Sequence, residues 1–201
     1  RHTRSFHVTG VQTCALPIFV YGISRSQPPT KLFSAPDTFY WIEGDISKAD
    51  EVKIAFERIS TPIDVLVNNA GVFEYGPFAD QSSKTIDKII DLNVKGTMYV
   101  TREAMKTINN GADIFFINSV AGLYEPEWEA IYSASKHAIT AFAGIIGREL
   151  RFDGIRVTSI HPGGMNTPMQ RNNPIKDRLL EPTEICDIIV QVLKSRSEEH
   201  T

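Results

Sequence analysis

The sequence predicts a doubly wound α/β domain, in which helices cover both faces of a parallel β-sheet. Short, largely apolar runs that are typical of buried strands recur along the chain, for example 63–68 (IDVLVN) and 113–118 (DIFFIN). Segments with apolar residues at helical spacing lie between them, and the chain has neither an internal repeat nor an interdomain linker. Strands that are apolar on both faces, each separated by a helix, indicate a parallel sheet buried between helical layers.

The first half of the chain alternates strands and helices. Residues 18–24 (IFVYGIS) and 38–46 (TFYWIEGDI) are rich in β-branched and aromatic side chains, which favours strands. Residues 48–59 have apolar side chains at helical spacing, so we expect a helix there. Ser47 and Asp50 are spaced as a capping box for this helix.

The second half continues the same alternation. The expected elements are, in order, a strand at 63–68, a helix at 82–106 in one or two pieces, a strand at 113–118, a long helix at 131–151, a strand at 155–161 and a helix at 182–194. Thr183 is the expected N-cap of the last helix.

Composition excludes several classes of protein. The chain has 201 residues, 42% of them hydrophobic, which suits one domain with a sizeable core. A net charge of -3 without a basic surplus argues against nucleic-acid binding, and no apolar run is long enough to cross a membrane. Two cysteines, Cys14 and Cys186, form no disulfide framework, so we expect a cytoplasmic protein. We expect no metal site.

Tyr132-Ser-Ala-Ser-Lys136 is the first candidate for chemistry. A spacing of four on the helix 131–151 places Tyr132 and Lys136 on one face, a turn apart. An ammonium beside a phenol favours the phenolate, so this tyrosine can act as a general acid or base near neutral pH. Alone the motif is weak, because two ordinary residues of a helix surface have this spacing by chance.

Further polar motifs lie near the ends of the predicted strands. Asn68-Asn69-Ala70-Gly71 ends one strand, Ser119 ends the next, and Pro162-Gly163-Gly164-Met165-Asn166-Thr167 follows the last. Asn93 lies on the helix between the first two of these. An open parallel sheet binds its ligands at the carboxyl ends of its strands, so we expect these residues to form one site.

In order and spacing, these motifs resemble those of the single-domain short-chain dehydrogenases/reductases, over residues from about 19 to 195. The resemblance implies a Rossmann-like fold and a cofactor that carries the hydride. It also implies catalytic roles: Tyr132 as general acid/base, Lys136 lowering its pKa and holding the nicotinamide ribose, Ser119 binding the substrate oxygen, and Asn93 holding a water of the proton relay. Asn68, Ala70 and Gly71 would line the adenosine side of the cofactor, and Pro162, Gly163 and Thr167 the nicotinamide end.

The type of cofactor follows from the end of the strand 18–24. An NAD site has an acidic residue near this point for the ribose 2′-hydroxyl, and the chain has none between Ile18 and Lys31. Arg25 and Ser26 instead suit a 2′-phosphate, although Arg25 also fits a solvated loop. We therefore expect NADP(H), with NAD(H) as the alternative. Asp45 and Ile46 match the family's adenine contact.

Both ends of the chain call for a separate explanation. Val8-Thr9-Gly10 imitates the family's glycine-rich turn, but too few residues separate it from the strand at 18–24 for that register. Residues 8–18 (VTGVQTCALPI) can be read as the translation of a nucleotide sequence resembling a sequencing-library adapter, and 196–201 (RSEEHT) as that of its reverse complement. We therefore expect residues 1–18 and 196–201 to be adapter artefacts flanking a partial domain at 19–195.

Such a truncation removes the first strand, its glycine-rich turn and the last strand. The first strand would lie between the strands at 18–24 and 63–68, so its loss leaves a gap in the sheet unless residues near 5–9 enter that place. We expect the complete parent to be an active reductase, and this chain to fold and bind cofactor poorly.

The leading interpretation is an oxidoreductase that transfers a hydride between NADP(H) and a carbonyl or secondary alcohol. The alternatives are a longer epimerase or dehydratase relative, a non-catalytic cofactor-sensing or interaction protein on the same fold, and an inactive fragment. Residues 120–128 and 164–173 are expected to line the pocket, which admits a 3-ketoacyl thioester, a sugar ketone, a steroid or a small aldehyde. The resemblance implies a homodimer or homotetramer.

Overall fold

A computed structural model of the chain describes residues 4–7, 18–28, 38–167, 169 and 179–198. Its centre is a six-stranded sheet in the order β3-β2-β1-β4-β5-β6, with every neighbouring pair parallel. The strands are β1 (Arg4–His7), β2 (Ile18–Ser24), β3 (Phe39–Glu43), β4 (Ile63–Asn68), β5 (Ile108–Ile117) and β6 (Arg156–Ile160). The predicted doubly wound parallel sheet is confirmed.

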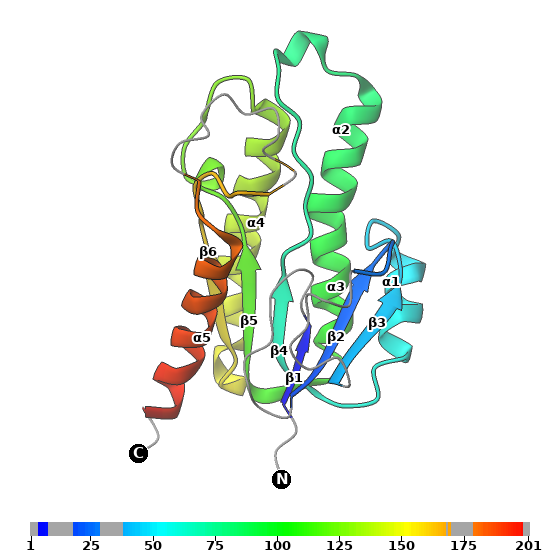
Figure 1. Cartoon of the computed structure of the whole chain (residues 1–201), viewed down its shortest axis with the longest axis vertical. Helices are drawn as coiled ribbons and strands as arrows, with labels where there is room; N and C mark the ends of the chain where they lie inside the picture. Colours follow the sequence, from blue (N-terminus) through cyan, green and yellow to red (C-terminus); the bar gives the residue numbers. More distant parts are fainter. Residues whose placement is uncertain (1–3, 8–17, 29–37, 168, 170–178, 199–201) are drawn as a thin grey trace.

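Helices lie on both faces of the sheet. They are α1 (Ala49–Glu57), α2 (Ser83–Ile89), α3 (Thr97–Ala104), α4 (Ala130–Glu149) and α5 (Pro182–Glu198), with a π-helical segment, η4 (Ile90–Gly96), joining α2 to α3. In Figure 1, α1, α3 and α4 lie behind the sheet and α5 lies in front of it. Short 3-10 turns, among them η5 (Val120–Gly122), complete the connections.

The core consists of two apolar layers, one on each face of the sheet. Leu66 and Phe116 point into the layer formed with α1, α3 and α4, whereas Val67 and Phe115 point into the layer formed with α5. Phe115 and Phe116 are both 0% exposed although they are neighbours. Successive side chains of a strand face opposite sides, so a strand buried on both faces must be apolar at every position, as the sequence shows.

β1 occupies the place where the family resemblance puts the first strand of the sheet. Its register pairs Phe6 with Val20 of β2 on one side and with Val65 of β4 on the other, so the sheet has no gap there. Gly10 lies outside the described residues. Within the part of the chain that the structure describes, no strand follows α5. The last strand was expected to be missing from this end of the chain.

Three local expectations are wrong. Lys48, and not Ser47, is the N-cap of α1, and it makes no side-chain cap bond, because the Ser47 hydroxyl instead donates to Asp45 Oδ1 at 2.7 Å. Thr183 is not the N-cap of α5, since that helix already begins at Pro182. β5 begins at Ile108, ahead of the predicted residue 113, because an irregular register between β4 and β5 lets the polar start of the strand pair with Ile63.

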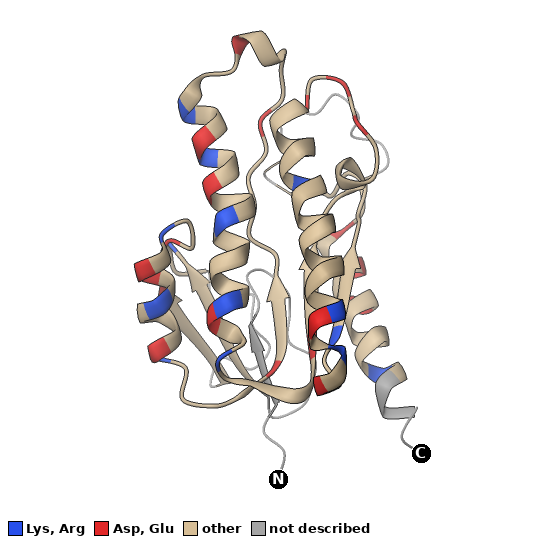
Figure 2. Cartoon of the chain, turned by 180° about the vertical axis from the view of Figure 1, so that it is seen from behind, with Lys and Arg blue, Asp and Glu red and all other residues tan. Residues whose placement is uncertain are grey.

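Charged residues are interspersed along the outward sides of α1, α2 and α3, whereas α4 carries few between its ends (Figure 2). Among the described helices, none is both long enough and apolar enough to cross a membrane.

Candidate active site

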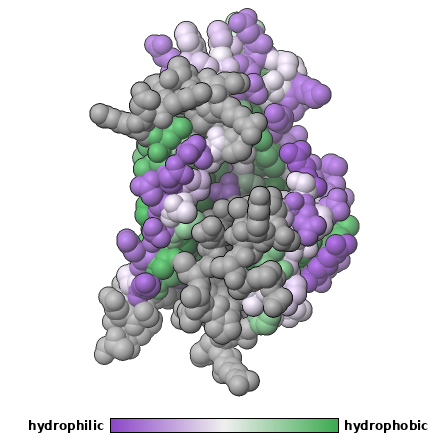
Figure 3. Space-filling view, viewed as in Figure 1, coloured by the Kyte–Doolittle hydropathy of each residue, from purple (hydrophilic) through white to green (hydrophobic). Residues whose placement is uncertain are grey.

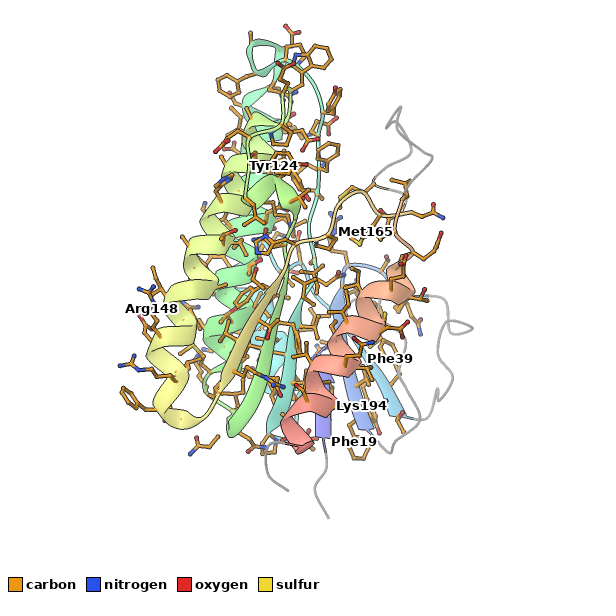
Figure 4. The ribbon with its side chains drawn as sticks, turned by 90° about the vertical axis from the view of Figure 1, so that its left-hand side faces the viewer. Phe19, Phe39, Tyr124, Arg148, Met165 and Lys194 are labelled. Carbon is orange, nitrogen blue, oxygen red and sulfur yellow. The ribbon has the colours of Figure 1, made fainter. Side chains whose placement is uncertain are left out.

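The predicted site residues from β5, α4 and the segment after β6 meet in one cavity of about 340 Å³. Ser119, Tyr132, Pro162, Gly163 and Thr167 all line it. This cavity lies beyond the carboxyl ends of β5 and β6, which is the end where a parallel sheet binds ligands. Figure 3 shows hydrophobic residues on both sides of a hollow in this face. Figure 4 labels two residues of its wall, Tyr124 before α4 and Met165 after β6.

Tyr132 and Lys136 lie one turn apart on α4, as predicted. The Lys136 ammonium donates to the Ile117 carbonyl at 3.2 Å and lies 5.6 Å from the centre of the Tyr132 ring. Burial lowers the pKa of Lys136 to about 8. Burial also raises the pKa of Tyr132, with a smaller rise from the Glu129 charge, while a hydrogen bond with Ser119 works in the opposite direction. The net shift of the Tyr132 pKa is therefore upward, opposite to the lowering expected from Lys136.

Ser119 is held from two sides at the end of β5. Its hydroxyl accepts a hydrogen bond from the Ala121 N–H at 3.1 Å, and its carbonyl lies 3.0 Å from His161 Nδ1. A carbonyl can only accept, so His161 Nδ1 carries a proton, and its Nε2 lies 2.9 Å from the Ser159 hydroxyl. His161, which the sequence analysis does not include in the site, therefore fixes the backbone of Ser119.

Asn93 lies in the π-helical segment and is 2% exposed. Its side-chain oxygen accepts from the Val72 N–H at 2.8 Å, and its amide nitrogen donates to the Val72 carbonyl at 2.9 Å and to Ser135 Oγ at 3.1 Å. Ser135 in turn donates to the Tyr132 carbonyl at 2.6 Å. Asn93 therefore ties the loop after β4 to the turn of α4 that carries the tyrosine, and single-turn π segments often occur at functional sites.

The residues predicted for the adenosine side form a second, smaller hollow. Ile46, Asn68 and Ala70 line it together. Gly71 lies between the two hollows, because a Cβ placed there would be 3.4 Å from Asn93 Oδ1 and 3.9 Å from Lys136 Nζ. The predicted residues therefore lie in a row in space, from Ile46 at the smaller hollow past Gly71 to Tyr132 at the large cavity.

Arg25 and Ser26 are exposed just beyond β2. Burial tends to raise the pKa of Asp45, but hydrogen bonds from Ser47, and then the charges of Arg25 and Lys48, lower it overall. Asp45 Oδ1 accepts both the N–H and the hydroxyl of Ser47, so this carboxylate is already engaged. The Arg25 side chain therefore lies near Asp45 at the edge of the adenosine side.

Several residues of the site were missed by the sequence analysis. Gly122 packs so closely on α4 that a Cβ there would lie 2.9 Å from the Lys136 carbonyl oxygen. The Asn118 amide donates to that same carbonyl at 3.1 Å and to Thr140 Oγ1 at 2.8 Å. Glu129 lines the large cavity beside Tyr132. The position of Asn118 directly before the serine, and of Gly122 three residues after it, is an available sequence signal for these two residues, but no such signal marks Glu129.

The donors at the large cavity fit the nicotinamide end of a dinucleotide. Ser119 and Tyr132 offer hydroxyls there, and the backbone at Gly163 faces open space, since a Cβ there would meet no atom within 4 Å. The buried Lys136 ammonium does not line the cavity but lies 5.6 Å from the centre of the Tyr132 ring. Among the described residues, no group of His, Cys, Asp and Glu side chains is placed to bind a metal ion.

This sheet, with a serine, a tyrosine and a lysine at its carboxyl edge, defines a dinucleotide-binding α/β domain of the oxidoreductase type. The chain belongs to the short-chain dehydrogenase/reductase family, because the family model described as short chain dehydrogenase matches residues 19–177.

Relatives and solved structures agree with this assignment. An uncharacterised oxidoreductase of Staphylococcus epidermidis (strain RP62A) is 34% identical over 172 residues, covering 84% of this chain and 72% of the relative. One of Staphylococcus aureus (strain MRSA252) is 30% identical over 166 residues, covering 79% and 71%. A short-chain dehydrogenase family protein of Francisella tularensis superposes with a TM-score of 0.84 at 22% identity, covering 94% of this chain and 90% of that one. A blue fluorescent protein from a metagenomic library, in complex with NADPH, gives 0.81 at 21% identity, covering 93% and 89%.

Proposed function

We propose that the protein interconverts a carbonyl compound and a secondary alcohol with NADP(H), and that Tyr132 is the general acid/base. The observation that carries this proposal is the shared cavity of Ser119 and Tyr132, with Lys136 buried directly behind the tyrosine. The bound cofactor supplies or accepts the hydride.

The chain's own residues handle the proton. In reduction, the Tyr132 hydroxyl donates its proton to the carbonyl oxygen, while the Ser119 hydroxyl donates a hydrogen bond to the same oxygen. The raised pKa of Tyr132 keeps the phenol protonated at neutral pH, which suits an acid in this direction. Lys136 would hold the nicotinamide ribose. Asn93 would hold a water behind Lys136, and this water would belong to the relay that returns a proton to Tyr132.

The preference for NADP(H) rests on the charge at the end of β2. Arg25 and Ser26 are exposed there and can contact a 2′-phosphate, whereas Asp45, the nearby acid, is occupied by Ser47. The metagenomic protein above was solved with NADPH. NAD(H) is the alternative, and the ratio of the Michaelis constants for NADPH and NADH tests the choice.

A comparison of the unmodified protein with Tyr132→Phe tests the catalytic proposal. The variant removes one hydroxyl and should leave NADPH binding within about 3-fold, while the rate of ketone reduction falls by at least about 100-fold, the contribution expected of a general acid. If both proteins oxidise NADPH equally fast with every ketone, the tyrosine is not the acid. If neither does and both bind NADPH, the non-catalytic alternative is favoured.

We further propose that residues 1–18 and 196–201 are adapter-encoded, which the start of the family match at residue 19 supports. β1 would then be a foreign segment that fills a vacant place in the sheet. Sequencing the source gene across both junctions tests this, because adapter codons must be absent from genomic DNA.

The complete parent is proposed to be a cytoplasmic homodimer or homotetramer that binds neither nucleic acid nor membrane. The few charges along α4 (Figure 2) and the exposed side chains of Ile145 and Phe152 at its carboxyl end support an interface between copies there. Analytical ultracentrifugation of the parent checks this assembly.

A further inference from the structure

Glu129 lies at the amino end of α4, one turn before Tyr132, and lines the same cavity as the catalytic hydroxyls. Glu129 is the N-cap of α4, and its side chain and the Tyr132 phenol border the same space. The two groups are close enough for the Glu129 charge to help raise the pKa of Tyr132, after the larger effect of burial.

The Glu129 carboxylate is partly buried and has no cationic or hydrogen-bonding side-chain partner among the residues that the structure describes. Glu103 shows the usual solution for a buried carboxylate here, since Arg102 and Lys106 both pair with it. Burial without such a partner raises the pKa of Glu129. A carboxylate removed from water in this way is stabilised by any cation that enters the cavity.

The remaining wall of the cavity suits an organic cation. Phe73, Tyr124 and Tyr132 contribute aromatic rings, and Phe73 packs edge-on against Tyr132 with ring centres 4.9 Å apart. Aromatic faces attract alkylammonium groups, and a carboxylate adds a direct counter-charge. No lysine or arginine is among the described residues that line the cavity, whereas Glu129 is, so this described part of the wall favours a cation over an anion.

We propose that this site takes a ketone, or the corresponding secondary alcohol, that carries an ammonium group, and that Glu129 pairs with the ammonium while Ser119 and Tyr132 bind the carbonyl oxygen. This inference rests on the proposed carbonyl reduction. A cavity of about 340 Å³ restricts the substrate to a small molecule in which both groups belong to one compact skeleton. The negative charge of Glu129 disfavours carboxylated and phosphorylated ketones as substrates.

Three ketones of equal chain length isolate the charge. They are 5-(trimethylammonio)pentan-2-one, its neutral carbon isostere 6,6-dimethylheptan-2-one, and the anion 5-oxohexanoate. The protein from the complete source gene is assayed with NADPH, and kcat/KM is measured for each. We expect the ammonium ketone to exceed its neutral isostere by at least about 10-fold, or about 1.4 kcal/mol, and the anion to be the poorest substrate.

Glu129→Gln removes the charge and keeps the shape. It should bring the ammonium and neutral ketones to within about 3-fold of each other. The matched control is Glu127→Gln, a nearby exposed glutamate that does not line the cavity, and it should leave the preference unchanged. Turnover of the neutral ketone by Glu129→Gln reports that the variant is folded.

The outcomes separate this inference from the proposed function. Suppose that the neutral ketone is reduced and that this reduction depends on Tyr132. If the ammonium ketone is then no better a substrate, or if its advantage over the neutral ketone persists in Glu129→Gln, the proposed carbonyl reduction stands and the proposed role of Glu129 is wrong. If no ketone is reduced, calorimetry decides the inference with the same three compounds. Tighter binding of the ammonium ketone that is lost in Glu129→Gln supports the ammonium subsite, and equal binding overturns it.

Discussion

Replacing Gly122 by alanine should damage stability and catalysis together. A Cβ at this position would lie 2.8 Å from Thr140 Oγ1 and 2.9 Å from the Lys136 carbonyl oxygen. Ordinary contacts for such atoms begin near 3.4 Å. α4 would therefore have to move by roughly 0.5 Å, and overpacking of this kind costs about 1–3 kcal/mol.

The displaced turn of α4 carries Lys136, and Tyr132 lies one turn before it. Because a shift of about 1 Å in a catalytic group can reduce a rate by about 100-fold, we expect kcat to fall by about 10- to 100-fold. Urea denaturation measures the stability loss, and steady-state reduction of a neutral ketone by the complete protein measures kcat.

Gly144→Ala is the matched control on the same helix. A Cβ there meets no atom within 4 Å, and alanine favours a helix interior over glycine by about 0.5–1 kcal/mol. We expect this variant to be at least as stable as the unmodified protein and equally active. Equal stability and kcat for Gly122→Ala and Gly144→Ala would refute the close packing at Gly122.

Arg25→Asp should raise the Michaelis constant for NADPH by at least about 10-fold, because it places a carboxylate where the 2′-phosphate of NADPH is expected. The Michaelis constant for NADH should change little. An unchanged Michaelis constant for NADPH counts against the preference for NADP(H). Asn93→Ala leaves the N–H and the carbonyl of Val72 without their side-chain partner, so the free energy of unfolding measured with denaturant should fall by about 1–3 kcal/mol. The control Asn109→Ala, at an exposed site, should lower it by under about 0.5 kcal/mol. The pKa of Lys136 falls from 10.5 to about 8 on folding, so the unfolded chain binds more protons between these values and stability should rise with pH across that window. Lys136→Met should flatten this dependence of stability on pH. If the variant shows the same dependence as the unmodified protein, the low pKa of the buried lysine is contradicted.

Most of the fold could be predicted because its signals are local. Strands buried on both faces, such as β4 and β5, show continuous apolar runs, and the helices between them show the spacing of amphipathic helices. Element ends were predicted less well, since the start of β5 depends on pairing with β4 and the start of α1 on which group Ser47 bonds.

The same distinction holds for the site. The spacing of Tyr132 and Lys136 follows from one helix, and Ser119 is placed by the end of one strand, so the sequence by itself determined the fold class, the family and the candidate catalytic set. Only the tertiary structure decided that Glu129 shares a cavity with Ser119, that Gly122 packs on Lys136 and that His161 holds the Ser119 carbonyl. These contacts join elements far apart in the chain, and their distances depend on how α4 packs against the sheet, which no local pattern of residues encodes.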